Sequence, residues 1–284
     1  MARHRIVARV GAALIALLAA FATAPPPAAA DDQHPAAEAP ARALLARQLA
    51  LLDADKVDEF RTTLLAGARC HVPDRGMLPC DDINLSWFYP ATRIRTKVRT
   101  LVVGATARSA WISGELDVAT TTPRHSGDVG PAFHSYTQRI RLTALVVRDG
   151  DAWRGALFWV STPSDHGINT DRATGTPGPL ATWLDDPTAM AAGLDVGPSV
   201  TVFGTALAER AFGAKAAAKL LGRWKKLRLE VGDDAEEREF GDTAVVTATV
   251  IHLAKDGRRG FDTSAVFHRT DAGWRLVAVH YAGM

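Results

Sequence analysis

The residues best suited to chemistry lie in the segment GWRLVAVHYAG, residues 273–283, which is predicted to be the last strand. Side chains alternate between the two faces of a strand, so Trp274, Leu276, Ala278 and His280 are expected to share one face. If that face lines a pocket, His280 is a candidate general base, because an unperturbed histidine has a pKa near ~6.5. The competing interpretation is a histidine that is hydrogen-bonded at the sheet edge.

Asp262, in the preceding strand RGFDTSAVF, is the candidate partner of His280. A carboxylate in an apolar cavity has a raised pKa and can act as a base or orient a histidine. The alternative is a solvated residue near the start of its strand. Tyr281 has the opposite parity to His280 and is expected to face helices or solvent. Trp159 belongs to an aromatic group that is either core or interface, or lines a pocket for an apolar ligand.

Motifs and charge exclude several other classes. The histidines show no HxH or HxxxH spacing and no acidic cluster accompanies them, so no metal site is predicted. The sequence has no GxSxG motif, and GRRG at 257–260 is interpreted as a hairpin turn, so neither serine hydrolysis nor a cofactor is predicted. The formal net charge is only +2, so the sequence does not predict a basic surface that binds nucleic acid. The basic cluster KKLR at 225–228 is interpreted as a solvated helix end.

The secondary-structure elements that position these residues are predicted to occur twice in the chain. Trp153 and Trp274 are 121 residues apart, and around each the sequence gives a charged turn, a tryptophan, an arginine and an apolar strand. Strands that form consecutive antiparallel hairpins are expected at 98–106, 109–120, 135–149 and 152–162. Strands are expected again at 227–231, 237–254, 259–271 and 273–283. Two copies of one fold is the economical interpretation.

Short amphipathic helices precede each set of strands. In the first half, Leu45, Leu49 and Leu52 follow helical spacing, and a second helix runs from Val57 to Leu64. In the second half, Asp186 is a predicted N-cap, Thr205 is expected to cap a short helix through Phe212 that explains the acidic Glu209, and a longer helix follows. Helices followed by a curved antiparallel sheet give an α+β fold, with each sheet wrapped as a cone and covered on one face.

The second half resembles a known family. VTVFGTALAERAFGAKAA, with Gly204, Thr205, Glu209 and Gly213 in the characteristic positions, resembles the SnoaL-like branch of the nuclear transport factor 2-like superfamily, and the closing strand with Trp274 and His280 also fits. The resemblance covers about 178–284 and implies a cone-shaped α+β barrel with a pocket between sheet and helices. For residues 38–163 the internal repeat implies the same fold, with Trp159 where the second half has His280.

The chain is therefore divided into a first domain at 41–163, a linker at 164–178 and a second domain at 179–284. Residues 1–30 combine a basic start with the 15-residue apolar run VGAALIALLAAFATA and a small-residue site, which is typical of a secretory signal peptide. Residues 31–40 are expected to be a disordered linker. The mature protein is then expected in the periplasm or outside the cell, without a membrane anchor.

Export favours a disulfide between Cys70 and Cys80, which are the two cysteines of the chain. For function, two hypotheses remain. The first is a non-catalytic protein that binds a small apolar molecule or serves as an interaction module. The second is an isomerase, cyclase or dehydratase that uses His280 and Asp262 as acid-base groups. The family resemblance implies that the two sheets pack on each other within the chain, and it leaves the oligomeric state open.

Overall fold

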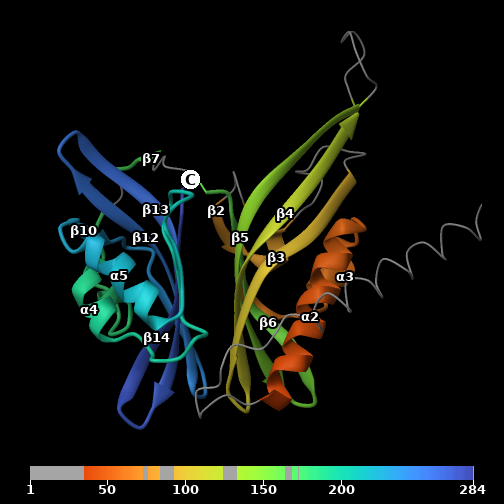
Figure 1. Ribbon diagram of the computed structural model, residues 1–284, viewed down its shortest axis with the longest axis horizontal. Coiled ribbons are helices and arrows are strands. Elements are labelled where there is room, and N and C mark those ends of the chain that lie inside the picture. Colours follow the sequence, from red (N-terminus) through yellow and green to blue (C-terminus); the bar gives the residue numbers. More distant parts are fainter. Residues whose placement is uncertain are drawn as a thin grey trace, which may run out of the picture.

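The protein consists of two sheets that face each other, each with its helices on the outer side (Figure 1). The computed structural model describes residues 35–72, 76–83, 93–123, 133–163, 168–171 and 173–283. The proposed signal peptide at 1–30 lies outside these residues. Within the described ranges, no helix combines the length and apolar character that crossing a membrane requires.

The first domain opens with helix α2 (Pro35–Asp53), followed by the short α3 (Val57–Arg61). Alanine and leucine, which have high helix propensity, dominate α2, and Leu45 and Leu49 are buried on its inner side. The helix already includes residues 35–40, so this part of the expected disordered linker is helical. Its sheet has the order β2-β1-β6-β5-β4-β3. The strands are β1 (Leu64–Val72), β2 (Gly76–Pro79), β3 (Arg93–Ala105), β4 (Ser109–Pro123), β5 (Phe133–Asp149) and β6 (Ala152–Ser161).

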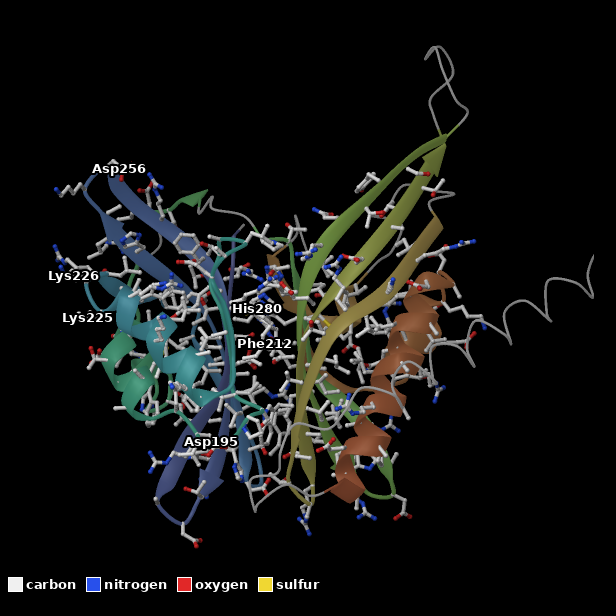
Figure 2. All side chains as sticks on the ribbon, in the orientation of Figure 1. Asp195, Phe212, Lys225, Lys226, Asp256 and His280 are labelled. Carbon is white, nitrogen blue, oxygen red and sulfur yellow. A yellow bond between two sulfur atoms is a disulfide. The ribbon has the colours of Figure 1, made fainter. Side chains whose placement is uncertain are left out.

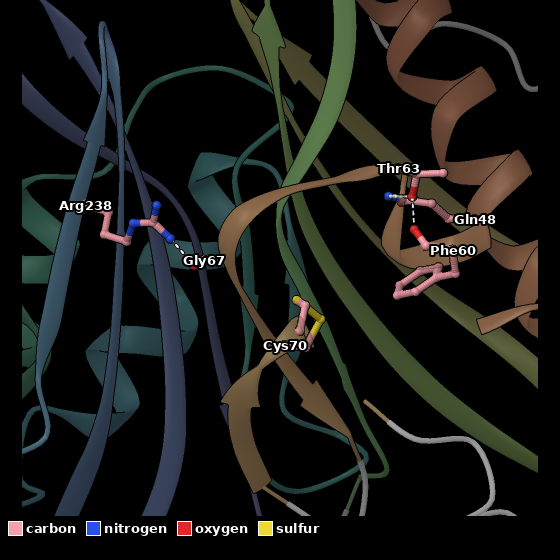
Figure 3. Close-up of a disulfide and its surroundings, with 7 residues drawn as sticks. Gln48, Phe60, Thr63, Gly67, Cys70 and Arg238 are labelled. Carbon is pink, nitrogen blue, oxygen red and sulfur yellow. Dashed lines mark hydrogen bonds between the residues drawn. A yellow bond between two sulfur atoms is a disulfide. The ribbon is translucent and has the colours of Figure 1, made fainter. Parts of the chain in front are cut away.

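The predicted disulfide between Cys70 and Cys80 is present and joins β1 to the short 3-10 helix η1 (Cys80–Asp82) (Figure 3). Both cysteines are buried in the core of the first domain. The sequence predicted a helix that runs through Leu64. Instead, Leu64 begins β1, which pairs in parallel with β6.

The second domain carries the 3-10 helix η3 (Ala181–Asp185), α4 (Pro187–Ala192) and α5 (Ala214–Trp224). The predicted N-cap is confirmed, because the Asp186 carboxylate accepts a hydrogen bond from the Thr188 amide at 2.8 Å. The predicted helix from Thr205 to Phe212 is wrong, because strand β9 occupies its end. The strands are β7 (Ile168–Asn169), β8 (Thr201–Phe203), β9 (Arg210–Phe212), β10 (Leu229–Val231), β11 (Glu236–Phe240), β12 (Thr243–Ala254), β13 (Gly257–Thr270) and β14 (Gly273–Ala282).

The two sheets share one topology. In the second sheet, β10-β12-β13-β14-β8-β9 is the main path, with β11 also paired to β12 and β7 to β13. The last strand of each domain has two neighbours in its sheet. It pairs in parallel with an early strand of the same domain, β6 with β1 and β14 with β8. It pairs antiparallel with the strand that precedes it in the chain, β6 with β5 and β14 with β13. Trp153 pairs with Arg148 and Trp274 with Arg269, which are equivalent positions 121 residues apart. The prediction of two copies of one fold is confirmed.

Both closing hairpins also carry the same bulge. In the first domain Leu145 pairs with Leu157 and Val146 with Gly155, which leaves Ala156 as an extra residue on β6. In the second domain Val266 pairs with Ala278 and Phe267 with Leu276, which leaves Val277 extra on β14. A bulge reverses which residues face the helices along the strand, and this decides where the candidate site residues point.

The two domains bury a shared apolar cluster between their sheets. Its members come from both halves of the chain: Trp111, Leu145, Val147, Ala156, Leu157, Trp159, Val245, Val266, Val277 and Ala278. Each domain also has its own core between sheet and helices. Each domain thus covers the face of the other domain's sheet that is turned away from that sheet's own helices.

Candidate functional site

His280 lies on the face of the second sheet that is turned toward the first domain (Figure 2). Its side chain is fully buried, and both ring nitrogens contact hydroxyls of the first domain: Nε2 lies 2.7 Å from the Ser161 Oγ and Nδ1 lies 3.1 Å from the Thr143 Oγ1. Burial lowers the pKa of His280 well below its ordinary value, and the positive charges of Arg141 and His71 lower it further. His280 is therefore a neutral ring that is held by both domains.

Arg141 of β5 crosses between the domains beside His280. The side chain is fully buried and donates hydrogen bonds to the carbonyl oxygens of Gly204, Ala206 and Leu207, the last two at 2.8 and 2.9 Å. Its guanidinium lies 5.3 Å from the ring centre of Phe203. Burial lowers the pKa of Arg141 to about 10, so the group remains charged at neutral pH.

Asp262 is buried in the same interface, at the end nearest to β2. Its Oδ2 lies 3.4 Å from the Nε2 of His71, whose ring stacks on Trp159 with 4.6 Å between ring centres. The His71 Nδ1 lies 2.6 Å from the Val160 carbonyl oxygen. A Cβ at Gly76 would lie 2.8 Å from the Asp262 Oδ2, so glycine is needed there for the carboxylate to fit. We call the set Arg141, Thr143, Trp159, Ser161, His71, Asp262 and His280 the interdomain seam.

Several contacts between the domains join equivalent positions of the two copies. Ser109 pairs with Val147 and Thr243 with His268, so the register makes Ser109 and Thr243 counterparts, and their hydroxyls hydrogen-bond to each other. Trp159 and His280 are counterparts as well, and their ring centres lie 6.5 Å apart. Contacts between equivalent residues are typical of an interface with a two-fold axis. The two domains therefore pack as a pseudo-symmetric pair.

The predicted common face of the last strand does not exist. Because Val277 is the bulged residue, Trp274 and Leu276 pack with the core of the second domain, whereas Ala278 joins the apolar cluster between the sheets and His280 joins the seam. The alternation rule assumed an unbroken strand. The structure brings Trp159, Ala278, His280 and Asp262 to the interdomain side and places Trp274 and Leu276 on the other.

A cavity of about 270 Å³ lies within the cone of the second domain, and neither His280 nor Asp262 lines it. Its apolar walls are Trp224 of α5, Leu229 of β10, Phe261 of β13 and Tyr281 of β14, and residues 204–206 close one side. We call this cavity the cone pocket. It lies between the curved sheet and α5, as the fold resemblance implies for a pocket.

Glu209 stands at the wall formed by residues 204–206. Its Oε1 accepts a hydrogen bond from the Trp224 Nε1 at 3.0 Å, and its Oε2 accepts one from the Ala206 amide at 3.3 Å. A Cβ at Gly204 would lie 2.4 Å from the Glu209 Oε2, so the wall requires a glycine. Glu209 was expected in the first turn of a helix, but it precedes β9 and instead anchors the pocket tryptophan.

Tyr281 faces the helices, buried between α4 and α5. The Tyr281 hydroxyl donates to the Leu184 carbonyl oxygen at 3.3 Å, and its ring lies 5.4 Å from that of Trp224. Burial raises the pKa of Tyr281 above its ordinary value, and the negative charge of Asp185 adds to this. The phenol is thus a neutral, packed wall of the cone pocket.

His252 and Arg259 supply the polar side of the cone pocket opposite Glu209. They form a cross-strand pair on β12 and β13. Partial burial lowers the pKa of His252, and the charge of Arg259 lowers it further, while Asp256 opposes both. Arg259 also hydrogen-bonds to Asp256 at the tip of the hairpin.

Sequence reasoning missed His252 and Arg259 as site residues. The available signal was parity along the strands: His252 is two residues from Val250, and Arg259 is two residues from Phe261. Since Val250 and Phe261 pack on the inner face of the sheet, the two polar side chains are expected on the same face. Within the described ranges, no group of three or more histidine, cysteine, aspartate or glutamate side chains is placed to hold a metal ion.

The chain matches one family model, the SnoaL-like domain, over residues 185–283. No curated protein sequence matches it significantly. Among solved structures, a Catenulispora acidiphila protein in complex with S-DNPA is 17% identical, with a TM-score of 0.37 over 45% of this chain and 95% of that one. A provisionally named NTF2-like dehydratase from Streptomyces avermitilis is 14% identical, with a TM-score of 0.39 over 44% and 95%.

A provisionally named ketosteroid isomerase from Parabacteroides distasonis is 16% identical, with a TM-score of 0.31 over 37% of this chain and 80% of that one. The family match spans the second domain from η3 to β14, and the first domain repeats its topology. The second half of this chain, over residues 185–283, is a SnoaL-like domain of the nuclear transport factor 2-like superfamily.

Proposed function

We propose that the protein binds a small, mainly apolar molecule in the cone pocket and does not catalyse a reaction there. The observation that carries this proposal is a cavity of about 270 Å³ whose walls are Trp224, Leu229, Phe261 and Tyr281. Small-molecule sites are typically concave, mainly apolar and provided with a few polar groups, at roughly 300–1,000 Å³. The volume of the cone pocket, about 270 Å³, lies just below this range, so its ligand is small.

The residues expected to act as acid and base support binding over catalysis. His280 has both ring nitrogens in contact with hydroxyls of the other domain and lies outside the cone pocket. Asp262 faces His71 across the seam. A general base must reach the proton that it removes, directly or through one water. The acid-base hypothesis on His280 and Asp262 therefore has no support from the geometry.

The first domain has a structural role in this proposal. Arg141 holds the carbonyl groups of Gly204, Ala206 and Leu207, and residues 204–206 form a wall of the cone pocket. The second domain would therefore depend on the first for the shape of its binding site. We also propose that the protein is exported, since residues 1–30 read as a signal peptide and Cys70 and Cys80 form a disulfide.

The neutral fluorescent probe N-phenyl-1-naphthylamine tests binding. Its fluorescence is expected to rise on titration with the full mature chain. The substitution Leu229→Trp, which adds volume at a pocket wall, is expected to abolish the rise. Val196→Trp adds the same side chain at a position that is 89% exposed and outside the cone pocket, so it is the matched control.

Absence of a fluorescence rise in the wild type would refute the proposal. An equal signal in Leu229→Trp and in the wild type would refute it too, because the probe would then be bound elsewhere. Export is tested separately by expressing the chain with its own leader in a bacterial host and sequencing the N-terminus of the exported protein. The expected first residue is Asp31, and protein that keeps Met1 and stays in the cytoplasm would contradict export.

A further inference from the structure

Positive charge is concentrated beside the cone pocket on two segments of the second domain. The turn after α5 contributes Lys225, Lys226 and Arg228, and the hairpin that joins β12 to β13 contributes Lys255, Arg258 and Arg259. We call these six residues the basic rim. Lys225, Lys226 and the hairpin residue Asp256 lie on the side of the second domain that points away from the first (Figure 2).

The basic rim is continuous with the walls of the cone pocket. The Leu253 amide donates to the Arg228 carbonyl oxygen at 2.8 Å, so the two segments run side by side. Between the rim residues, Leu227 and Leu229 line the cavity, and Arg259 lines it from the other segment. Leu227 is 37% exposed, so the cavity reaches the surface at the rim.

Local carboxylates neutralise only part of this charge. Asp256 hydrogen-bonds to Arg259, and Glu230 lies 3.6 Å from Arg258. Among the described residues, Lys225, Lys226, Arg228 and Lys255 form no ion pair. An unbalanced group of cations at the mouth of a small cavity attracts an anion.

The opposite wall has the opposite charge. Glu209 belongs to the turn between β8 and β9, at the far end of the sheet order from β12 and β13, and its carboxylate is held by Trp224 and Ala206. A ligand anion would be repelled at that wall and stabilised at the rim. The apolar walls between them contact the rest of the ligand.

We propose that the ligand of the cone pocket is an anionic amphiphile, whose small apolar body fills the cavity and whose carboxylate or phosphate group is bound at the basic rim. This inference rests on the proposed function and adds the chemical class of the ligand. Arg259 is the rim residue that lines the cavity, and its guanidinium has donors left for a ligand oxygen besides the one used by Asp256.

Three probes of equal chain length test the inference: octanoate, octyl phosphate and octan-1-ol, each competing with bound N-phenyl-1-naphthylamine. An ionic group is hydrated more strongly than a hydroxyl, so an apolar cavity without the rim would prefer the alcohol. We expect the better of the two anions to bind about tenfold tighter than octan-1-ol at low salt, with the difference shrinking in ~1 M NaCl. The ranking of the two anions identifies the head group.

Charge-neutral variants locate the effect. Arg259→Gln is expected to weaken binding of the preferred anion about tenfold and to leave octan-1-ol within about twofold. The double variant Lys225→Gln/Lys226→Gln is compared with Lys215→Gln/Lys219→Gln, which removes the same charge from exposed positions on α5. Only the first pair is expected to weaken anion binding.

Equal or tighter binding of octan-1-ol than of both anions would overturn the inference while leaving the proposed function intact. Equal losses in the two lysine pairs would also overturn it, because net charge alone would then explain the binding. If N-phenyl-1-naphthylamine itself fails to bind, the proposed function fails, and the inference fails with it.

Discussion

Arg141→Met is expected to destabilise the protein and to loosen the cone pocket from the other domain. The substitution keeps an apolar stem in the seam but removes three hydrogen bonds to the carbonyls of Gly204, Ala206 and Leu207. Hydrogen bonds to charged groups contribute about 1.5–3 kcal/mol each. Against this, burial lowers the pKa of Arg141 to about 10, and this shift corresponds to about 3 kcal/mol against the charged form.

Three such hydrogen bonds sum to about 4.5–9 kcal/mol, so the net loss is about 1.5–6 kcal/mol. This range includes the roughly 3–5 kcal/mol typical of removing one partner from a buried charged contact. Urea unfolding followed by tryptophan fluorescence measures the loss. Arg139→Met is the matched control, two residues earlier on β5, since Arg139 only approaches Asp117 at 3.9 Å and is partly exposed. Its expected cost is below about 1 kcal/mol.

The same pair of variants tests the link between the domains. N-phenyl-1-naphthylamine is expected to bind more weakly to Arg141→Met than to Arg139→Met, because residues 204–206 lose their support from the first domain. Equal stability of the two variants would refute the stabilising role of the hydrogen bonds from Arg141 to the second domain. Unchanged probe binding in a destabilised Arg141→Met would show that the first domain does not shape the pocket.

Three further outcomes follow from the geometry. Below about pH 6.5, the free energy of unfolding of the wild type should fall by up to about 1.4 kcal/mol per pH unit more than that of His280→Gln. The cause is that the histidine of the unfolded chain takes up a proton, whereas the folded one, with its lowered pKa, does not. Urea unfolding at several pH values measures this difference. Reduction of the Cys70–Cys80 bridge should cost roughly 3 kcal/mol, measured by unfolding with and without reductant, and intact mass should rise by two hydrogens. Octanoate affinity, measured by probe displacement, should rise as the pH falls below about 6.5, because the lowered pKa of His252 places its protonation there and the protonated ring attracts the anion. No such rise is expected for octan-1-ol or in His252→Gln.

The sequence was sufficient to predict the duplicated sheets because their signals are local. Alternation in the long hairpins, the charged turns before Trp153 and Trp274, and the Asp186 cap all depend on neighbours in the chain. Strands β1 and β9 could not be predicted in this way. Strand β1 is held by parallel pairing with β6, which is distant in sequence, and such tertiary pairing overrides local propensity. Strand β9 pairs with its neighbour β8 across a turn that is closed by the hydrogen bond from the Gly204 amide to the Glu209 carbonyl oxygen.

The candidate site was mislocated by a single inserted residue. The expectation that Trp274 and His280 share a face requires an unbroken period of two, and the bulge at Val277 shifts every later side chain to the other face. Ala156 at the equivalent position does the same for Trp159. Both bulges lie at the same distance from the tryptophan of their repeat. The sequence does not predict them, because the bulged residue is apolar and lies within an apolar strand, so it does not differ in type from its neighbours.

The bulges also account for the division of roles between the two copies. The bulges turn Trp159, His280 and their neighbours toward the other domain, so that each sheet presents a face with polar and apolar side chains that fits its counterpart, as in an isologous pair. The two cores between sheet and helices, which do not take part in this contact, differ in how they are filled. Helix α2, the disulfide and the edge-to-face contact of Phe60 with Phe158 at 5.3 Å fill the first core, whereas the shorter helices of the second leave the cone pocket beside Trp224. The first copy thus packs against the sheet of the second copy, and the second copy keeps the cavity and the basic rim beside it.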